Sequence, residues 1–374
     1  MFSSYESIYP LAKVSRHDLS KLCEVLWGWE PCPDWTAERA CQHPSPDPGY
    51  VTAYYVPELD IDCSPAIQSH DDLIDIIRCI KNHADKPRLQ ITLEHFSTGT
   101  KLGDQQLTPS NDQNRAFNLA ARIMTMLLCT VEGQSDGLLE AGSQPSIWHS
   151  DRSFNQFINA AIPKQGQVRL GPCNDSIPQL DLPLGAITAK RLKKVAKLRL
   201  IPTNDLRDHL LLDSTNGTVA LYHYTSVLKE HLGLPSTHQQ ANLPDELLLE
   251  TLYTLKHILF PIDPESQSIL RFLVRKEKFD PDICRVDTLW QPQERVSMVY
   301  EHWGTRLLDL YDELENPTPR GFLETWIERR SGARYVMMAT VAGVIIAVLL
   351  GGFSLAVSIF QAWISWQQWK HPAS

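Results

Sequence analysis

The feature that most constrains this chain is a long apolar stretch near its C-terminal end. From Tyr335 to Trp369 the sequence contains no Asp, Glu, Lys or Arg. A bilayer core about 30 Å thick is crossed by about 20 apolar residues, each adding about 1.5 Å of helix. The alternative, a buried helix of a soluble protein, is seldom apolar on every face over such a length. The stretch therefore predicts a single transmembrane helix over residues 335–364, followed by a short tail, 365–374.

Basic and aromatic residues flank this stretch in the way expected where a helix meets lipid headgroups. Aromatic rings gather at membrane–water interfaces, and Lys and Arg are enriched in cytoplasmic flanks. Three arginines precede the stretch and one lysine follows it, which predicts a cytosolic N-terminal part and a topology that resembles a tail anchor. The expected interface residues are Arg329, Arg330, Arg334, Tyr335, Trp363, Trp366, Trp369 and Lys370.

Small residues recur every four positions inside the stretch, at Ala339, Gly343, Ala347 and Gly351. This spacing lets two membrane helices approach closely, and it predicts a homodimer formed through the membrane. Four residues turn a helix by about 400°, so the row drifts by about 40° at each step and cannot face one straight partner along its whole length. Ordinary enrichment of small residues in membrane helices is therefore the alternative.

The sequence before residue 317 predicts a mainly α-helical soluble part. Apolar residues recur there at helical spacing, and residues that cap helices precede several of the runs, as Ser69 does. The run from Ser110 has so little polar surface that we expect it to be the central buried helix, ending at Gly133. Other helices are expected from Ser15, Ser150, Leu243, Asp263 and about Gln293, the last of them ending at Glu315.

One β signal interrupts the helical pattern. Asn216 and Gly217 favour the positive φ angles of a tight turn, and they lie between two apolar runs. They predict a β-hairpin near 211–223, after which Thr225 or Ser226 is expected to cap another helix.

The poorly periodic segment 165–184 contains Gly and Pro and is the best candidate for a domain boundary. It would separate an N-terminal helical region, 1–165, from a second helical region, 185–316, which carries the hairpin. Residues 317–334 would then form a juxtamembrane segment.

Net charge and cysteine spacing indicate the cellular compartment and the kinds of partner that this chain can have. A formal charge of -9 argues against general nucleic-acid binding. The eight cysteines show no tight spacing and no apolar signal segment opens the chain, so we expect free thiols in the cytosol. The glycosylation sequons at Asn174 and Asn216 would then stay unused, which makes them reporters of topology. No motif indicates a cofactor.

The motif DDLID contains the acidic residues Asp71, Asp72 and Asp75, and its DDxxD pattern resembles the magnesium-binding aspartates of class I terpene and prenyl synthases. The resemblance implies an all-α, magnesium-dependent enzyme of lipid or terpenoid metabolism. That chemistry needs a second motif on an opposing helix, and NDLRDHLLLD, from Asn204, does not have the family's spacing. The simpler interpretation is a capped first turn whose acids complement the helix dipole.

A basic segment, AKRLKKVAKLRL, places Leu192, Val195 and Leu198 at helical spacing between positive charges. Three interpretations remain open: a solvated face, a surface for anionic lipid or an acidic partner, and a nucleic-acid surface, which the acidic chain and the anchor disfavour. The basic residues are Lys190, Arg191, Lys193, Lys194, Lys197 and Arg199.

Five stretches carry a resemblance to a family of uncharacterised filamentous-fungal proteins. They are CPDW (32–35), ELDIDCSPA (58–66), RLIPTNDLRDHL (199–210), VLKEHL (227–232) and YDELENPTPRGFLETWIERRSGARYVMMAT (311–340). The resemblance covers nearly the whole chain, and it implies a fungal source, an α-rich cytosolic region and a C-terminal anchor. It implies no reaction and no active site.

The sequence thus favours a non-enzymatic, single-pass membrane protein whose cytosolic helical domain binds another protein or the membrane surface. The juxtamembrane residues Phe322, Trp326 and Arg329 fit that interpretation. The alternative is the magnesium-dependent enzyme with its site at Asp71, Asp72 and Asp75.

Overall fold

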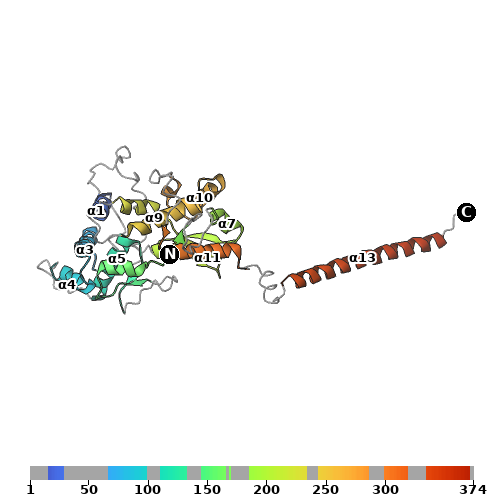
Figure 1. The fold of residues 1–374 in the computed structure, drawn as a ribbon, viewed down its shortest axis with the longest axis horizontal. Helices are drawn as coiled ribbons and strands as arrows, with labels where there is room; N and C mark the ends of the chain where they lie inside the picture. Colours follow the sequence, from blue (N-terminus) through green and yellow to red (C-terminus); the bar gives the residue numbers. More distant parts are fainter. Residues whose placement is uncertain are drawn as a thin grey trace, which may run out of the picture. The chain divides into compact units, whose positions relative to one another are not determined.

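The computed structural model describes nine parts of the chain (Figure 1): residues 16–28, 66–98, 110–132, 145–165, 168–169, 185–233, 243–285, 299–318 and 334–370. The chain divides into two compact units, Met1–Pro317 and Thr318–Ser374. The described residues are mostly helical with a few short strands, which confirms the predicted mainly α class.

In the described part of the first unit, the first helices are α1 (Arg16–Trp27), α3 (His70–Asn82), α4 (Arg88–Thr98) and α5 (Ser110–Thr125). Helix α3 lies against α1, α4 and α5, and buries the apolar stripe that contains Leu73 and Ile77. Ser69 caps α3 as predicted: its hydroxyl accepts from the Asp72 backbone N–H while the Asp72 carboxylate accepts from the Ser69 backbone N–H.

Helix α5 is deeply buried, but it ends at Thr125 rather than at the predicted Gly133. Met126 adopts a left-handed φ of 61°, and its carbonyl accepts from the Leu206 backbone N–H. The chain then enters strand β1 (Cys129–Thr130), which runs parallel to β2 (Ser146–Ile147). The Met126 carbonyl, which would have accepted a hydrogen bond in a further helical turn, thus accepts from the distant Leu206 instead. The sequence of α5 alone cannot show this contact.

An aromatic cluster follows β2. Trp148 packs on Phe154 and Phe157 of helix α6 (Phe154–Ala161), and the Arg88 guanidinium lies 4.8 Å from the Trp148 ring centroid. This cluster joins α4 to α6 within the first unit.

A three-stranded sheet forms the only larger β element among the described residues. Its strand order is β4 (Arg199–Thr203), β6 (Thr218–Tyr222) and β5 (Leu211–Asp213). The antiparallel β5–β6 pair confirms the predicted hairpin, and Gly217 has a φ of 65° in its turn. The parallel pairing of β4 with β6 was not predicted. Helix α7 (Ala189–Lys194) precedes β4, and the 3-10 turn η3 (Leu206–Asp208) precedes β5.

The rest of the first unit is again mainly helical. Its elements are α8 (Thr225–Leu232), α9 (Asp245–Tyr253), the π-helical turn η5 (Thr254–Leu259), α10 (Pro264–Lys276), the 3-10 turn η6 (Pro281–Cys284), β7 (Val299–Tyr300) and α11 (Gly304–Glu315). Strand β7 is antiparallel to β3 (Val168–Arg169). The helix predicted from about Gln293 is therefore shorter, because Val299 and Tyr300 pair as a strand and α11 begins only at Gly304.

The predicted cap of α8 is also wrong. The N-cap position is Tyr224, and neither Thr225 nor Ser226 caps the helix. Their hydroxyls instead donate to Asp282 and Asp280, and the Asp280 carboxylate also accepts from the Ser226 backbone N–H. Helix α8 is thus capped from a distant turn rather than by its own first residues.

The second unit contains one long helix, α13 (Arg334–Lys370), of 37 residues. Its segment Thr340–Gln367 is long and apolar enough to cross a membrane, and none of the apolar window within it is buried. The predicted interface residues Arg329 and Arg330 lie outside the described residues, as do the side chains of Arg334, Tyr335, Ala339 and Trp369.

Candidate functional site

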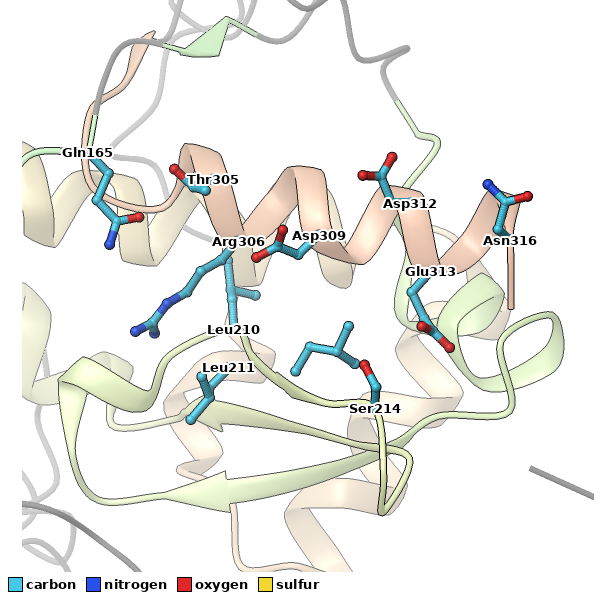
Figure 2. A pocket seen from close by; sticks show the side chains of 11 residues that line it. Gln165, Leu210, Leu211, Ser214, Thr305, Arg306, Asp309, Asp312, Glu313 and Asn316 are labelled. Atoms are coloured by element: carbon cyan, nitrogen blue, oxygen red, sulfur yellow. The ribbon is translucent and has the colours of Figure 1, made fainter. Parts of the chain in front are cut away.

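A cavity of about 810 Å³ opens between helix α11 and strand β5 (Figure 2). On the strand side it is lined by Leu210, Leu211, Leu212 and Ser214, with Gln165 at one end. Its size falls within the range of about 300–1,000 Å³ found for ligand pockets. The helix side is polar, and its residues are Thr305, Arg306, Asp309, Asp312, Glu313 and Asn316.

Helical spacing explains why α11 presents a polar wall. Leu307, Leu310 and Leu314 repeat at intervals of three and four and are buried. Positions 305, 306, 309, 312, 313 and 316 repeat with the same period, so they share a different side of the helix. The sequence GTRLLDLYDELEN therefore builds one apolar and one acidic face.

Arg306 holds this wall to the turn before β5. Its Nη1 donates to the backbone carbonyls of Arg207 and His209, and its guanidinium lies 5.1 Å from the Trp303 ring centroid. Burial lowers the pKa of Arg306 from its ordinary value of 12.5, but the group remains a cation near neutral pH. The Arg306 guanidinium is thus directed at the chain just before β5, on the strand side of the cavity.

The ring of His209, just before β5, forms two hydrogen bonds that hold this part of the chain in place. Thr254 donates its hydroxyl to the Thr251 carbonyl, so its oxygen accepts from His209 Nε2 at 2.7 Å. The Tyr222 backbone N–H donates to His209 Nδ1 at 3.3 Å, which defines a neutral ring protonated at Nε2. Burial lowers the pKa of His209 to about 3. The ring therefore connects the sheet to the π-helical turn η5, which follows α9, and it is not a proton carrier near pH 7.

Helix α9 also sets where α11 begins. The Glu250 carboxylate accepts from the backbone N–H groups of Glu301, His302 and Trp303, with shortest distances of 2.6, 2.9 and 3.0 Å. Trp303 Nε1 donates to Thr251 Oγ1 at 2.9 Å. Burial raises the pKa of Glu250, and the three N–H donors act in the opposite direction. These contacts pin the N-terminal end of α11, and therefore one wall of the cavity, to a buried helix.

The cavity favours positive charge. Asp309 and Asp312 are exposed, and Figure 2 shows Glu313 directed toward the strand, whereas Asp312 projects away from the strand at the outer rim of the cavity. The C-terminal end of α11 adds the negative end of its helix dipole. The lining holds three carboxylates and one guanidinium, so Arg306, which interacts with the charge of Asp309, offsets only part of this potential.

The DDxxD motif lies elsewhere, and each of its carboxylates has its own contact. Asp71 pairs with Lys21 at 2.8 Å, Asp75 pairs with Arg78 at 3.1 Å, and Asp72 belongs to the cap of α3. Among the residues that the structure describes, no three His, Cys, Asp or Glu side chains are grouped in a way that could hold a metal ion. The capping role of Asp72 confirms the simpler interpretation for that residue.

The basic segment forms a surface together with α10. Lys190 and Lys194 pair with Glu265 at 2.6 and 3.2 Å, and Lys193 Nζ lies 5.3 Å from the Phe272 ring centroid. Arg191 donates to the Ala186 carbonyl at 2.6 Å.

The helix itself ends at Lys194, so Lys197 and Arg199 lie beyond it. Leu192 and Leu198 are buried in the core, whereas Val195 is exposed. Two of the three apolar residues therefore face the protein and cannot enter a bilayer.

Helix α13 carries the remaining predicted residues. Trp363 and Trp366 are exposed, and Lys370 Nζ lies 4.4 Å from the Trp366 ring centroid. A Cβ added at Gly343 or Gly351 would meet no atom within 4 Å. The space beside these two glycines of the small-residue row is thus open.

Sequence reasoning missed the cavity between α11 and β5. The polar stripe of α11 could have been found from its period, but nothing in the local sequence connects it to residues 210–214. No protein-family model matches the chain, and searches of curated proteins and of solved structures found no similar protein.

Proposed function

We propose that this chain is a single-pass membrane protein anchored by α13, with a cytosolic first unit that acts as an interaction module. The observation that carries the proposal is that the apolar window within Thr340–Gln367 is entirely unburied. Apolar surface in water costs about 25 cal/mol per Å², and soluble monomers rarely expose continuous apolar patches beyond a few hundred Å². A bilayer removes that cost, and α13 is long enough to cross it.

The ends of α13 support an orientation. Lys370 and Trp366 form a basic and aromatic pair at the C-terminal end, as at a membrane–water interface. The arginines before Tyr335 outnumber this single lysine, which favours a cytosolic first unit. The small residues Gly343 and Gly351 support a homodimer through the membrane.

An interaction role, rather than catalysis, is supported by how the buried polar groups of the first unit are used. His209 and Glu250 each hold elements of the fold together. The cavity between α11 and β5 instead presents exposed carboxylates beside a leucine-lined strand, which suits recognition of a partner. No catalytic residue or cofactor is proposed.

The anchor is tested by carbonate extraction of microsomes that contain the full chain. We expect the wild type in the membrane pellet. Replacing Val348 and Leu349 together by Arg adds about 5–7 kcal/mol to insertion and should release the protein into the supernatant. The matched variant, with both residues replaced by Ile, should stay in the pellet. A wild type extracted by carbonate would refute the anchor.

Orientation is read from the same microsomes by protease protection and glycosylation. Asn216 is exposed in the hairpin turn and lies in an Asn-Gly-Thr sequon. A cytosolic first unit is digested and carries no glycan. Protection together with a glycosidase-sensitive mobility shift, lost when Asn174→Gln and Asn216→Gln are combined, would place the unit in the lumen.

A further inference from the structure

We propose that the cavity between α11 and β5 binds an extended basic peptide of a partner protein, which adds a strand beside β5 and places Lys or Arg side chains against Asp309 and Asp312. This deepens the proposed function, since it rests on the first unit being an interaction module. It does not depend on the membrane anchor.

The first argument is that the cavity follows an edge of the sheet. Successive side chains of a strand point to opposite faces, yet the neighbours Leu211 and Leu212 of β5 both line the cavity, as does Leu210, which precedes the strand with a left-handed φ of 61°. A space reached by consecutive residues lies along the strand's edge rather than over one face. In the described sheet β5 is the outer strand and pairs only with β6.

The second argument is that this edge has backbone groups to offer. Within the described part of the chain, Leu211 and Leu212 make no hydrogen bond beyond the β5–β6 ladder. A strand edge is a template for another extended chain, and peptide recognition by strand addition uses this property. Helix α11 does not fill the space, because the cavity of about 810 Å³ lies between the helix and the strand.

The third argument is charge. Asp309 and Asp312 are three residues apart on α11, so their Cβ atoms lie about 5–6 Å apart along the rim. Both are exposed, and together with Glu313 they outnumber Arg306 among the lining residues, although the Arg306 charge interacts with Asp309. Complementary charge selects the partner and its register, so the occupant is cationic.

The fourth argument is the exposed apolar surface beside the acids. Leu211 is 46% exposed at the cavity, although most leucines of this unit are buried. A peptide strand alternates its side chains between two faces. Basic residues on one face would meet Asp309 and Asp312, and apolar residues on the other would cover Leu211. The expected partner sequence therefore alternates basic and apolar residues.

The test uses the full chain in neutral detergent micelles and the fluorescein-labelled peptide ARVKVRA, followed by fluorescence anisotropy. We expect the double variant Asp309→Asn with Asp312→Asn to weaken binding about fivefold to tenfold. The matched control neutralises two exposed acids outside the cavity, Asp151→Asn with Glu246→Gln, and should leave binding unchanged. All these side chains are exposed, so equal thermal midpoints will show that each variant is folded.

Two further probes separate strand addition from simple charge attraction. A peptide with N-methylated backbone at alternate residues keeps its charges but cannot pair, and it should lose most of its affinity. The variant Leu211→Lys places a cation in the cavity and should also weaken binding.

The proposal is overturned if the control variant weakens binding as much as the Asp309 and Asp312 variant does. It is equally overturned if the N-methylated peptide or an acidic peptide, AEVEVEA, binds as tightly as ARVKVRA. Displacement by spermine at the affinity of the peptide would assign the cavity to a small polycation instead. Because micelles replace the bilayer, failure here leaves the anchor proposal standing, and failure of the anchor leaves this binding measurable.

Discussion

The buried ion pair between Lys229 and Asp282 gives the most quantitative prediction. Lys229 Nζ lies 2.6 Å from Asp282 Oδ2, and both side chains are only 4% exposed. The same carboxylate accepts from Thr225 Oγ1 at 3.1 Å, which ties the first turn of α8 to η6. Replacing Lys229 by Met preserves much of the side-chain volume and leaves the Asp282 charge in the interior.

Removing one partner of a buried pair costs about 3–5 kcal/mol, because the remaining charge loses its closest counter-ion and has little access to water. The half-exposed Arg285, whose Nη1 lies 3.8 Å from Asp282 Oδ1, compensates only part of this loss. The first unit spans Met1–Pro317, so its unfolding entropy at about 2.1 cal/mol/K per residue is roughly 0.7 kcal/mol/K. Lys229→Met should therefore lower the midpoint of thermal unfolding by about 4–7 °C, measured by circular dichroism. The affinity for the basic peptide should not change.

A double-mutant cycle checks the cause. Lys229→Met with Asp282→Asn removes both charges and should cost about 2–3 kcal/mol less than the sum of the single variants. Lys86→Met is the matched control, because it breaks an exposed pair with Glu94 and should cost less than about 1 kcal/mol. Additive single effects, or a buried variant no more destabilised than Lys86→Met, would refute the reasoning.

Three other predictions concern the histidines, the DDxxD motif and α13. Burial lowers three pKa values to about 3 or 4, at His209, His223 and His231. These rings stay neutral in the folded state but take up protons near pH 6.5 when unfolded, so stability is full above that pH and falls below it. Urea unfolding should show a loss of about 2 kcal/mol per histidine between pH 7 and pH 5. Asp71→Asn with Asp75→Asn should leave the midpoint of urea unfolding nearly unchanged, because both acids form exposed pairs. Calorimetry should detect no magnesium binding that the variant removes. Gly343→Ile with Gly351→Ile should abolish a cross-linked dimer in bilayers, whereas Val344→Ile should not.

The helices of the first unit were predictable where a local pattern decides them. Ser69 and Asp263 precede clear apolar stripes, and both residues cap helices in the structure. The end of α5 and the start of α11 were not predictable, because a distant backbone N–H of Leu206 and the distant carboxylate of Glu250 determine them. A local sequence pattern shows the spacing of apolar residues and the capping residues. It does not show which distant group will hydrogen-bond to the free N–H or C=O groups at a helix end.

The candidate site was harder to predict for a related reason. Its acidic wall is local, since Asp309 and Asp312 share one side of a single helix. The strand side of the cavity comes from residues 210–214, about a hundred positions earlier in the chain. Long-range hydrogen bonds of His209 and Arg306 help to bring these residues and α11 together. The sequence instead drew attention to the DDxxD cluster, which is a denser acidic motif but consists of separately paired residues on α3.

Chain connectivity links the cavity to the proposed anchor. Helix α11 ends at Glu315 and α13 begins at Arg334, so the 18 residues 316–333 join them. A fully extended chain spans at most about 3.5 Å per residue, which bounds the separation of these two ends at about 65 Å. With α13 anchored as proposed, the length of this connection would keep a peptide bound beside α11 near the membrane. Partners carried on the same membrane would meet the cavity at a raised effective concentration, so modest affinity for a basic strand would suffice there although it would not in bulk cytosol.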